Sequence, residues 1–241
     1  MTRLALLYAL GLLGLGLLDG CVFYGGGGQS IGYEPDPITY RNDFGSAGGT
    51  FDDKGLDCSQ DVTVCTNVPH PLGTATTCDA TTRRCVLLVE LRQVETIAFL
   101  SQPNFPVAIS GAASIKARVD SASYWSQNGL PIATPPIEIY VGPANIQNQN
   151  DTGAVLFGTI GTIAARSSTS CQAGAPGTRD SACAVEIAAP GRDALAKLAN
   201  NIRTPFNVLV VTILRLRGGD ALPTGTFELT VAPRLSFTIG G

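Results

Sequence analysis

Residues 206–239 read FNVLVVTILRLRGGDALPTGTFELTVAPRLSFTI, and this stretch decides the fold. In its second half, apolar residues occupy every other position from Phe227 to Val231 and again from Leu235 to Ile239. Alternation with a period of two is typical of a strand that buries one face and leaves the other in water. The stretch therefore predicts β-strands, with one face in a core, at the C-terminal end of the chain.

The first half of the stretch, residues 206–217, carries a second pattern. Its even positions are mostly apolar, whereas its odd positions are apolar from Leu209 to Ile213 and then become Arg215 and Arg217. A strand with apolar residues on both faces is covered on both faces. One end of this strand is therefore expected to be covered on both sides, and the other end on one side only.

A short amphipathic helix is predicted over Asp193–Ile202, directly before this strand. Leu195, Leu198 and Ala199 fall on one face at helical spacing. The dipeptide Pro190-Gly191 is expected to end the preceding strand. The helix is the nearest element that could cover the doubly apolar end of the strand.

Strand-like segments recur from Val86 onward and are separated by turns. They show apolar runs or apolar alternation at residues 86–91, 114–120, 137–141, 154–164 and 184–188. Short strands with a single good helix predict an antiparallel β-sandwich over residues 87–241. The expected fold class is mainly β: this sandwich with one short helix, preceded by a small disulfide-rich module and a flexible tether.

The N-terminus has the features of an export signal. Arg3 precedes a run of 15 apolar or small residues, Leu4–Leu18, which is shorter than the roughly 20 residues of a membrane span. The segment Leu18-Asp19-Gly20-Cys21 resembles the lipobox of bacterial lipoproteins, although Asp19 departs from its usual small uncharged residue. The resemblance implies a signal peptide over residues 1–20, acylation of Cys21 and, because Val22 follows, an outer-membrane anchor. An ordinary secretory signal with an unmodified Cys21 is the alternative.

The cysteine count agrees with acylation of Cys21. The chain has seven cysteines, and an odd number in an exported protein leaves one thiol to explain. With Cys21 acylated, six remain, enough for three disulfides in an oxidising compartment. Cys171 and Cys183 flank a loop with glycines and a proline between two predicted strands. We expect these two to pair with each other.

Residues 56–86 are expected to form a small cysteine-rich module. Cys58, Cys65, Cys78 and Cys85 would pair among themselves, and the interleaved arrangement Cys58–Cys78 with Cys65–Cys85 is favoured. Spacing alone leaves the other two connectivities open. Structural zinc usually needs C-x2-4-C pairs, which this spacing lacks, and His70 is the only histidine. The sequence therefore predicts no metal site here.

Two segments resemble proteins of one bacterial group. Residues 77–86 look like the tight cysteine-rich hairpins near the N-termini of lipoproteins from myxobacteria-like organisms. Residues 137–240, with IYVGP at 139–143 and LPTGT at 222–226, are similar to lipoproteins of the same group. The resemblance implies a shared fold and a disulfide knot, and it implies no activity.

The segment between the cysteine anchor and the module, residues 21–55, is expected to be a flexible acidic tether. It contains Gly25–Gly28 and two prolines, Pro35 and Pro37, with few aliphatic side chains to offset the entropy of ordering. A cluster of acidic residues spans the boundary between the tether and the cysteine-rich module, at Asp52, Asp53, Asp57 and Asp61. A calcium site is the alternative interpretation, but the spacing matches no calcium loop, so a solvated acidic tether is expected.

The candidate ligand-binding residues are one aromatic pair. A single histidine leaves a Ser or Cys nucleophile without its usual base, and no cofactor motif occurs. Trp125, the only tryptophan, and its neighbour Tyr124 are the candidate ligand contacts, because an exposed aromatic ring among Asn and Gln residues offers a flat platform for a sugar. Ordinary packing of both rings is the alternative interpretation.

Charge narrows the class of partner. Charged residues make up 15% of the chain and the net charge is −3, without the basic stripe that nucleic-acid binding needs. The predicted function is that of a membrane-anchored, non-enzymatic binding module with an envelope protein or polysaccharide as partner and no cofactor. The alternative is an envelope polysaccharide or peptidoglycan hydrolase that uses paired carboxylates.

Overall fold

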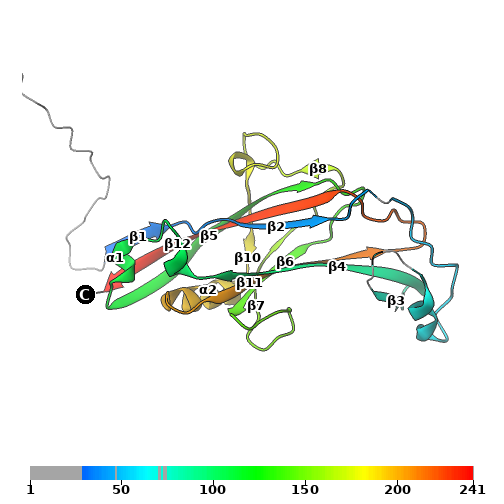
Figure 1. The fold of residues 1–241 in the computed structure, drawn as a ribbon, viewed down its shortest axis with the longest axis horizontal. Helices are drawn as coiled ribbons and strands as arrows, with labels where there is room; N and C mark the ends of the chain where they lie inside the picture. Colours follow the sequence, from blue (N-terminus) through cyan, green and yellow to red (C-terminus); the bar gives the residue numbers. More distant parts are fainter. Residues whose placement is uncertain (1–28, 47, 70–71, 73–74, 241) are drawn as a thin grey trace, which may run out of the picture.

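A computed structural model describes residues 29–46, 48–69, 72 and 75–240, and in these residues the protein is an antiparallel β-sandwich (Figure 1). Two sheets, here called sheet I and sheet II, face each other, and each has six strands in the described ranges. The predicted fold class, mainly β with few helices, is therefore confirmed. The expected signal peptide of residues 1–20, the acylation site Cys21 and His70 lie outside the described residues.

Sheet I is built around the long C-terminal strand β12. One edge of β12 pairs with β5, and its other edge pairs with β1 and β2, one after the other. Two short strands, β8 and β9, pair with the far edge of β5. The strands of sheet I are β1 (Gln29–Tyr33), β2 (Ile38–Asp43), β5 (Ser114–Asn128), β8 (Ser167–Ser168), β9 (Cys183–Ala184) and β12 (Thr226–Gly240).

Sheet II has the order β10-β7-β6-β11-β4-β3. Its strands are β3 (Ala75–Asp79), β4 (Arg84–Ile97), β6 (Ile137–Pro143), β7 (Val155–Ile160), β10 (Glu186–Ile187) and β11 (Phe206–Leu216). The helices of the described chain are η1 (Val62–Asn67), η2 (Phe99–Ser101), α1 (Val107–Ser110), η3 (Arg179–Ser181) and α2 (Ala189–Asn200). None of these helices is long and apolar enough to cross a membrane.

The core lies between the two sheets and follows the predicted alternation. Phe227, Leu229 and Leu235 on β12 are almost completely buried and Val231 is buried with them, whereas Glu228 is partly exposed and Arg234 is exposed. Near the end of the sandwich where β1 begins, aromatic rings pack together, with centroids 5.1–6.2 Å apart; they belong to Tyr33, Phe99, Phe105, Phe206 and Phe237. Burial of these apolar side chains stabilises the fold.

A β-bulge at Asp120 changes which residues of β5 face the core. Val119 pairs with Leu235 and Ser121 pairs with Arg234, so Asp120 is the extra residue. Before the bulge the odd-numbered residues point inward, and after it the even-numbered residues do. Every side chain beyond the bulge is thereby placed on the opposite face from the one that the first half of the strand predicts.

The predicted tether of residues 21–55 is wrong for its described part. Residues 29–33 and 38–43 form β1 and β2 and are paired along their length with β12. Tyr33, Ile38 and Tyr40 are buried in the core. Three well-placed large side chains and a ready-made strand edge offset the entropy of ordering a segment that is otherwise poor in apolar residues. The sandwich thus includes residues 29–43 as well as residues 87–240.

The helix α2 starts earlier than predicted and covers a different surface. Pro190 lies in its first turn, where the missing N–H is not needed. Gly191 lets the helix approach β7 closely, because a Cβ there would lie 2.2 Å from the Cα of Phe157. The helix packs against β5 of sheet I and against β6 and β7 of sheet II, so it joins the two sheets on the core side.

The outer face of β11 is covered by the β6–β7 loop, and not by the helix as expected. The Asn207 Nδ2 group donates to the carbonyl oxygens of Ala144 and Ile146, each at 2.9 Å. Ile146 is completely buried, and so is Leu209 on the outer side of β11. The doubly apolar end of the strand was correctly recognised from the sequence, but its cover comes from an irregular loop that carries no periodic pattern.

The cysteine-rich segment is continuous with the sandwich. Cys58 pairs with Cys78 and Cys65 with Cys85, the arrangement that the sequence analysis favoured, and Cys171 pairs with Cys183. Cys65 and Cys85 are completely buried within the main core. Since Cys85 belongs to β4, which continues into the centre of sheet II, residues 56–86 are the end of the sandwich and not a separate module.

Candidate functional site

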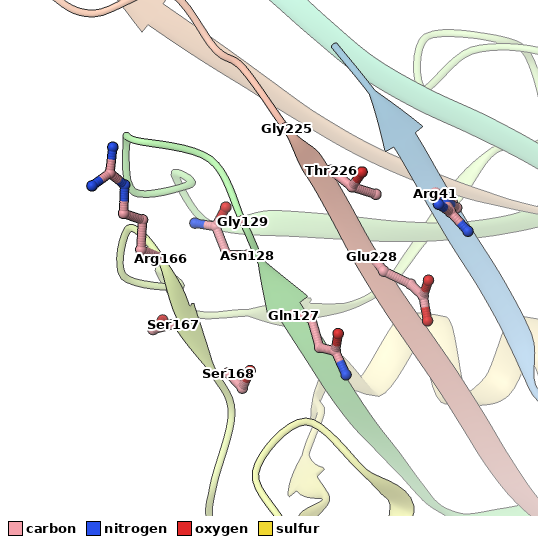
Figure 2. A pocket seen from close by; sticks show the side chains of 10 residues that line it. All are labelled: Arg41, Gln127, Asn128, Gly129, Arg166, Ser167, Ser168, Gly225, Thr226 and Glu228. Atoms are coloured by element: carbon pink, nitrogen blue, oxygen red, sulfur yellow. The ribbon is translucent and has the colours of Figure 1, made fainter. Parts of the chain in front are cut away.

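The outer face of sheet I carries a broad hollow of about 710 Å³ (Figure 2). Its lining comes from β2, β5, β8 and β12 and from the turns beside them. Figure 2 shows Gln127 and Glu228 on neighbouring strands, with Arg41 on β2 to one side and Arg166 on the loop to the other. Four strands and a loop therefore supply polar groups to one shallow surface.

Four of these side chains stand in one row across the sheet. Glu228 lies directly opposite Arg41 on one side and Gln127 on the other, and Gln127 lies opposite Ser168. Directly opposite residues have Cβ atoms roughly 4.5–5.5 Å apart. Within the described part of the chain Arg41 and Glu228 form no ion pair. A guanidinium, a carboxylate, an amide and a hydroxyl are therefore all presented to a ligand in solution.

Trp125 lies on the same outer face, one row away. It precedes Gln127 by two residues on β5, so both side chains leave the same side of the strand. Its neighbour across the sheet is Thr230, whose hydroxyl lies 3.0 Å from that of Thr39. The indole is half-buried. An aromatic ring and two hydroxyl groups thus continue the polar row along the sheet.

Tyr124, the second candidate contact, points the other way. It lies after the bulge at an even position, is half-buried and packs against the core. Burial raises the pKa of its phenol above the ordinary value of 10.0. Tyr124 is therefore a packing residue, and Trp125 alone remains on the candidate face.

The loop closed by the Cys171–Cys183 disulfide forms one rim of this face. Thr169 is tied to β5 in both directions: its N–H donates to the Ser126 carbonyl at 3.0 Å and its hydroxyl accepts from the Ser126 N–H at 2.8 Å. Gly177 has a φ of +74°, and a Cβ there would lie 2.8 Å from Gln127 Cγ. Only glycine lets the loop turn this close to the polar row.

Sequence reasoning missed Arg41, Gln127, Glu228 and Gly177 as site residues. Arg41 fell in the predicted tether, and Glu228 lies at an outward position of the alternating strand predicted from Phe227 to Val231. Pairing of Glu228 with Gln127 depends on the strand register, which the sequence leaves open. The signals that pointed to this face were Trp125, identified from the sequence, and the outward alternation around Glu228.

The carboxylates of the acid cluster accept hydrogen bonds within turns or form ion pairs. Asp52, Asp57 and Asp61 each accept a backbone N–H two residues ahead. Hydrogen bonds lower the pKa of each carboxyl, first from the Lys54 side chain for Asp52, from the Ser59 N–H for Asp57 and from the Thr63 hydroxyl for Asp61. Asp53 accepts from Arg84 at 2.9 and 3.0 Å, and this hydrogen bonding lowers its pKa. The acid cluster therefore caps local turns and pairs with arginine.

Two smaller hollows contain pairs of acids. One, of about 350 Å³, is lined by Asp36 and Glu95 among other residues. In the other, Glu34 faces Arg179 at 2.5 Å and Arg234 at 3.7 Å, so this carboxylate is engaged by two arginines.

A sulfur cluster in the core is not a metal site. The Sγ atoms of Cys58, Cys65 and Cys85 lie within 4.8 Å of one another. Each of the three belongs to a disulfide and therefore has no thiolate to offer a metal.

The fold and this face define a two-sheet β-sandwich with one polar outer surface that carries a tryptophan. No family model matches the chain, and no curated protein matches it. Among solved structures it is similar to the VP2 subviral particle of infectious bursal disease virus, with 8% identity and a TM-score of 0.21. That match covers 86% of this chain and 39% of the viral chain. A likeness this weak carries no argument about function.

Proposed function

We propose that the protein is an exported lipoprotein, anchored to the outer membrane through acylated Cys21, that binds envelope polysaccharide on the outer face of sheet I. The observation that carries the binding proposal is the row Arg41–Glu228–Gln127–Ser168 with Trp125 beside it. Three disulfides support an oxidising compartment.

The chemistry of the face suits a sugar better than an apolar ligand. A sugar ring has one face of C–H groups, which stacks on an indole, and an edge of hydroxyl groups, which both donate and accept hydrogen bonds. Glu228 and the Gln127 carbonyl accept, whereas Arg41 and the Gln127 amide donate. The hollow is broad and open on a continuous sheet, so a chain of several sugars can lie along it.

The alternative, a hydrolase, needs a general acid with a raised pKa and a second carboxylate at a defined distance. Among the residues that line the hollow on the outer face of sheet I, Glu228 is the only carboxylate. The carboxyl groups with shifted pKa values, such as Asp53 and Asp151, are shifted downward by hydrogen bonds. These features favour binding, and we propose that the protein is not an enzyme.

The test of binding is co-sedimentation of the full chain with insoluble peptidoglycan and, separately, retention on immobilised outer-membrane polysaccharide. Trp125→Ala is expected to weaken binding about fivefold or more, because stacking on an aromatic ring contributes on the order of 1–3 kcal/mol, and Trp125→Phe should recover part of the loss. Arg41→Ala should weaken binding too. Arg215→Ala, an exposed arginine on β11 of the other sheet, is the matched control and should have no effect.

Two outcomes contradict the binding proposal. Binding that is unchanged in Trp125→Ala and Arg41→Ala places the ligand elsewhere, and release of soluble sugar that is lost in Glu228→Gln makes the protein a hydrolase. A protein partner that co-purifies from detergent extracts and competes with polysaccharide would replace polysaccharide as the ligand. Anchoring is tested separately by intact mass, which should begin at Cys21 with added acyl mass.

A further inference from the structure

A basic pocket lies at the end of the sandwich where β1 begins. It measures about 690 Å³ and runs from the outer surface of sheet I around the edge of β5 to α2. Its basic residues are Lys116, Arg118, Arg192 and Lys197, and Asp193 is its one acid. All four basic side chains are exposed.

Most of this positive charge has no acidic partner. Arg118 is paired with Asp120 at 2.8 Å. Within the described chain Lys116, Arg192 and Lys197 form no ion pair. The cluster therefore keeps a net positive charge on a protein whose net charge is −3, and it is suited to an anionic partner.

The pocket adjoins the point where the chain enters the sandwich. Ser30, the second residue of β1, lines it, and Ser30, Thr238 and Lys116 lie opposite one another across sheet I. Cys21 precedes Gln29 by eight residues, which at about 3.3–3.6 Å per residue span at most ~29 Å. An acyl anchor at Cys21 would therefore hold this end, and no other, close to the bilayer.

Exposed apolar side chains occupy the same end. Val107 on α1 is 84% exposed and Leu100 on η2 is 43% exposed, and Figure 1 shows α1 beside β1 and the C-terminal end of β12. An apolar side chain flanked by lysines and arginines is typical of a surface that lies on a membrane. The opposite end, with the β3–β4 hairpin, carries the acid cluster and would face away from an anionic surface (Figure 1).

We propose that this end of the sandwich docks on the bilayer, with the basic pocket on the phosphate groups of anionic lipids and Val107 at the interface. The proposal rests on the proposed anchoring at Cys21. Docking fixes the orientation: the long axis of the sandwich rises from the membrane. The polar row at Glu228 lies ten residues along β12 from Thr238 in the pocket, so it is held away from the bilayer and open to polysaccharide. Each basic side chain near such a surface strengthens binding about fivefold.

The test uses the full chain with Cys21→Ser, which has no acyl group, and vesicles of phosphatidylglycerol and phosphatidylcholine in equal parts. We expect it to sediment with these vesicles and not with pure phosphatidylcholine, and to be released as salt is raised. Lys116→Glu with Lys197→Glu should weaken binding at least 25-fold. Arg215→Glu with Arg217→Glu makes the same change in net charge at the far end of β11 and should leave most of the binding intact. Val107→Asp is expected to weaken binding without altering the pocket.

Three results overturn the proposal. The first is equal binding to both kinds of vesicle, and the second is an equal loss of binding in the two charge-reversed pairs. The third is displacement by inorganic phosphate that exceeds displacement by chloride at the same ionic strength. That third result would make a free phosphate ion the ligand. The intact mass of the wild-type chain reports acylation separately. A missing acyl group with intact vesicle binding would therefore refute the anchor alone.

Discussion

Replacing Tyr33 with alanine tests whether the N-terminal strands are part of the core. Its side chain is 5% exposed, and its ring lies 5.1 Å from that of Phe105 and 6.0 Å from that of Phe99, both edge-on. Truncating a buried aromatic residue to alanine costs roughly 3–5 kcal/mol, through lost transfer free energy and the cavity left behind. The hydroxyl donates to Gln102 Oε1, so Tyr33→Phe should cost about 1 kcal/mol.

The assay is urea unfolding of the purified full chain, followed by circular dichroism. Tyr33→Ala should lower the free energy of unfolding by about 3 kcal/mol with an unchanged dependence on urea. Ser30→Ala, on the exposed side of the same strand, is the control and should change it by less than about 0.5 kcal/mol. If Tyr33→Ala changed stability no more than Ser30→Ala, residues 29–33 would be a tether after all, and the assignment of β1 to the sandwich would be refuted.

Three further predictions concern the disulfides, an ion pair and the rim of the face. Replacing both Cys65 and Cys85 with alanine should lower the free energy of unfolding by about 3 kcal/mol or more in the same assay, because their 20-residue separation corresponds to that loss of loop entropy in the chain-entropy model; an unchanged midpoint would contradict it. Arg84→Gln should lower the melting temperature at neutral pH. The folded-state pKa of Asp53 is depressed below 3.8, so the stabilisation by the ion pair is present above pH 3.8 and is lost as pH falls through the depressed pKa. The melting temperatures of the wild type and the variant should therefore converge in acid. A difference in melting temperature that persists in acid would refute the pairing. Gly177→Val should weaken polysaccharide retention by crowding the polar row. Because valine is strained at a φ of +74°, it should also lower the free energy of unfolding by about 1–3 kcal/mol. Equal retention would show that the loop is not a rim.

The sandwich itself was predictable because its strands obey a local rule. Apolar residues alternate along β12 and β6, and the same residues are buried in the structure. The disulfide pairs were also within reach, since the cysteine spacing leaves few arrangements and the loop at 171–183 favours its own closure. These features depend on residues close together in the sequence.

The parts that could not be predicted depend on long-range pairing. β1 and β2 have too few apolar residues to be recognised alone, and they become strands because the edge of β12 pairs with their backbone groups. The bulge at Asp120 makes Trp125 face outward and Tyr124 inward. The alternation of residues around Asp120 does not predict this bulge. The candidate face was therefore only partly predictable from the sequence: its tryptophan was identified, but its polar row was not.

The fluorescence of Trp125 offers the most direct test of the polysaccharide-binding face, because Trp125 is the only tryptophan in the chain. Envelope polysaccharide is titrated into the full chain while the emission maximum and quenching by acrylamide are followed. The account predicts a shift to shorter wavelength and reduced quenching that saturate together with binding, because the sugar covers the indole on the outer face of sheet I. Saturable binding that leaves both the emission and the quenching of Trp125 unchanged would contradict it.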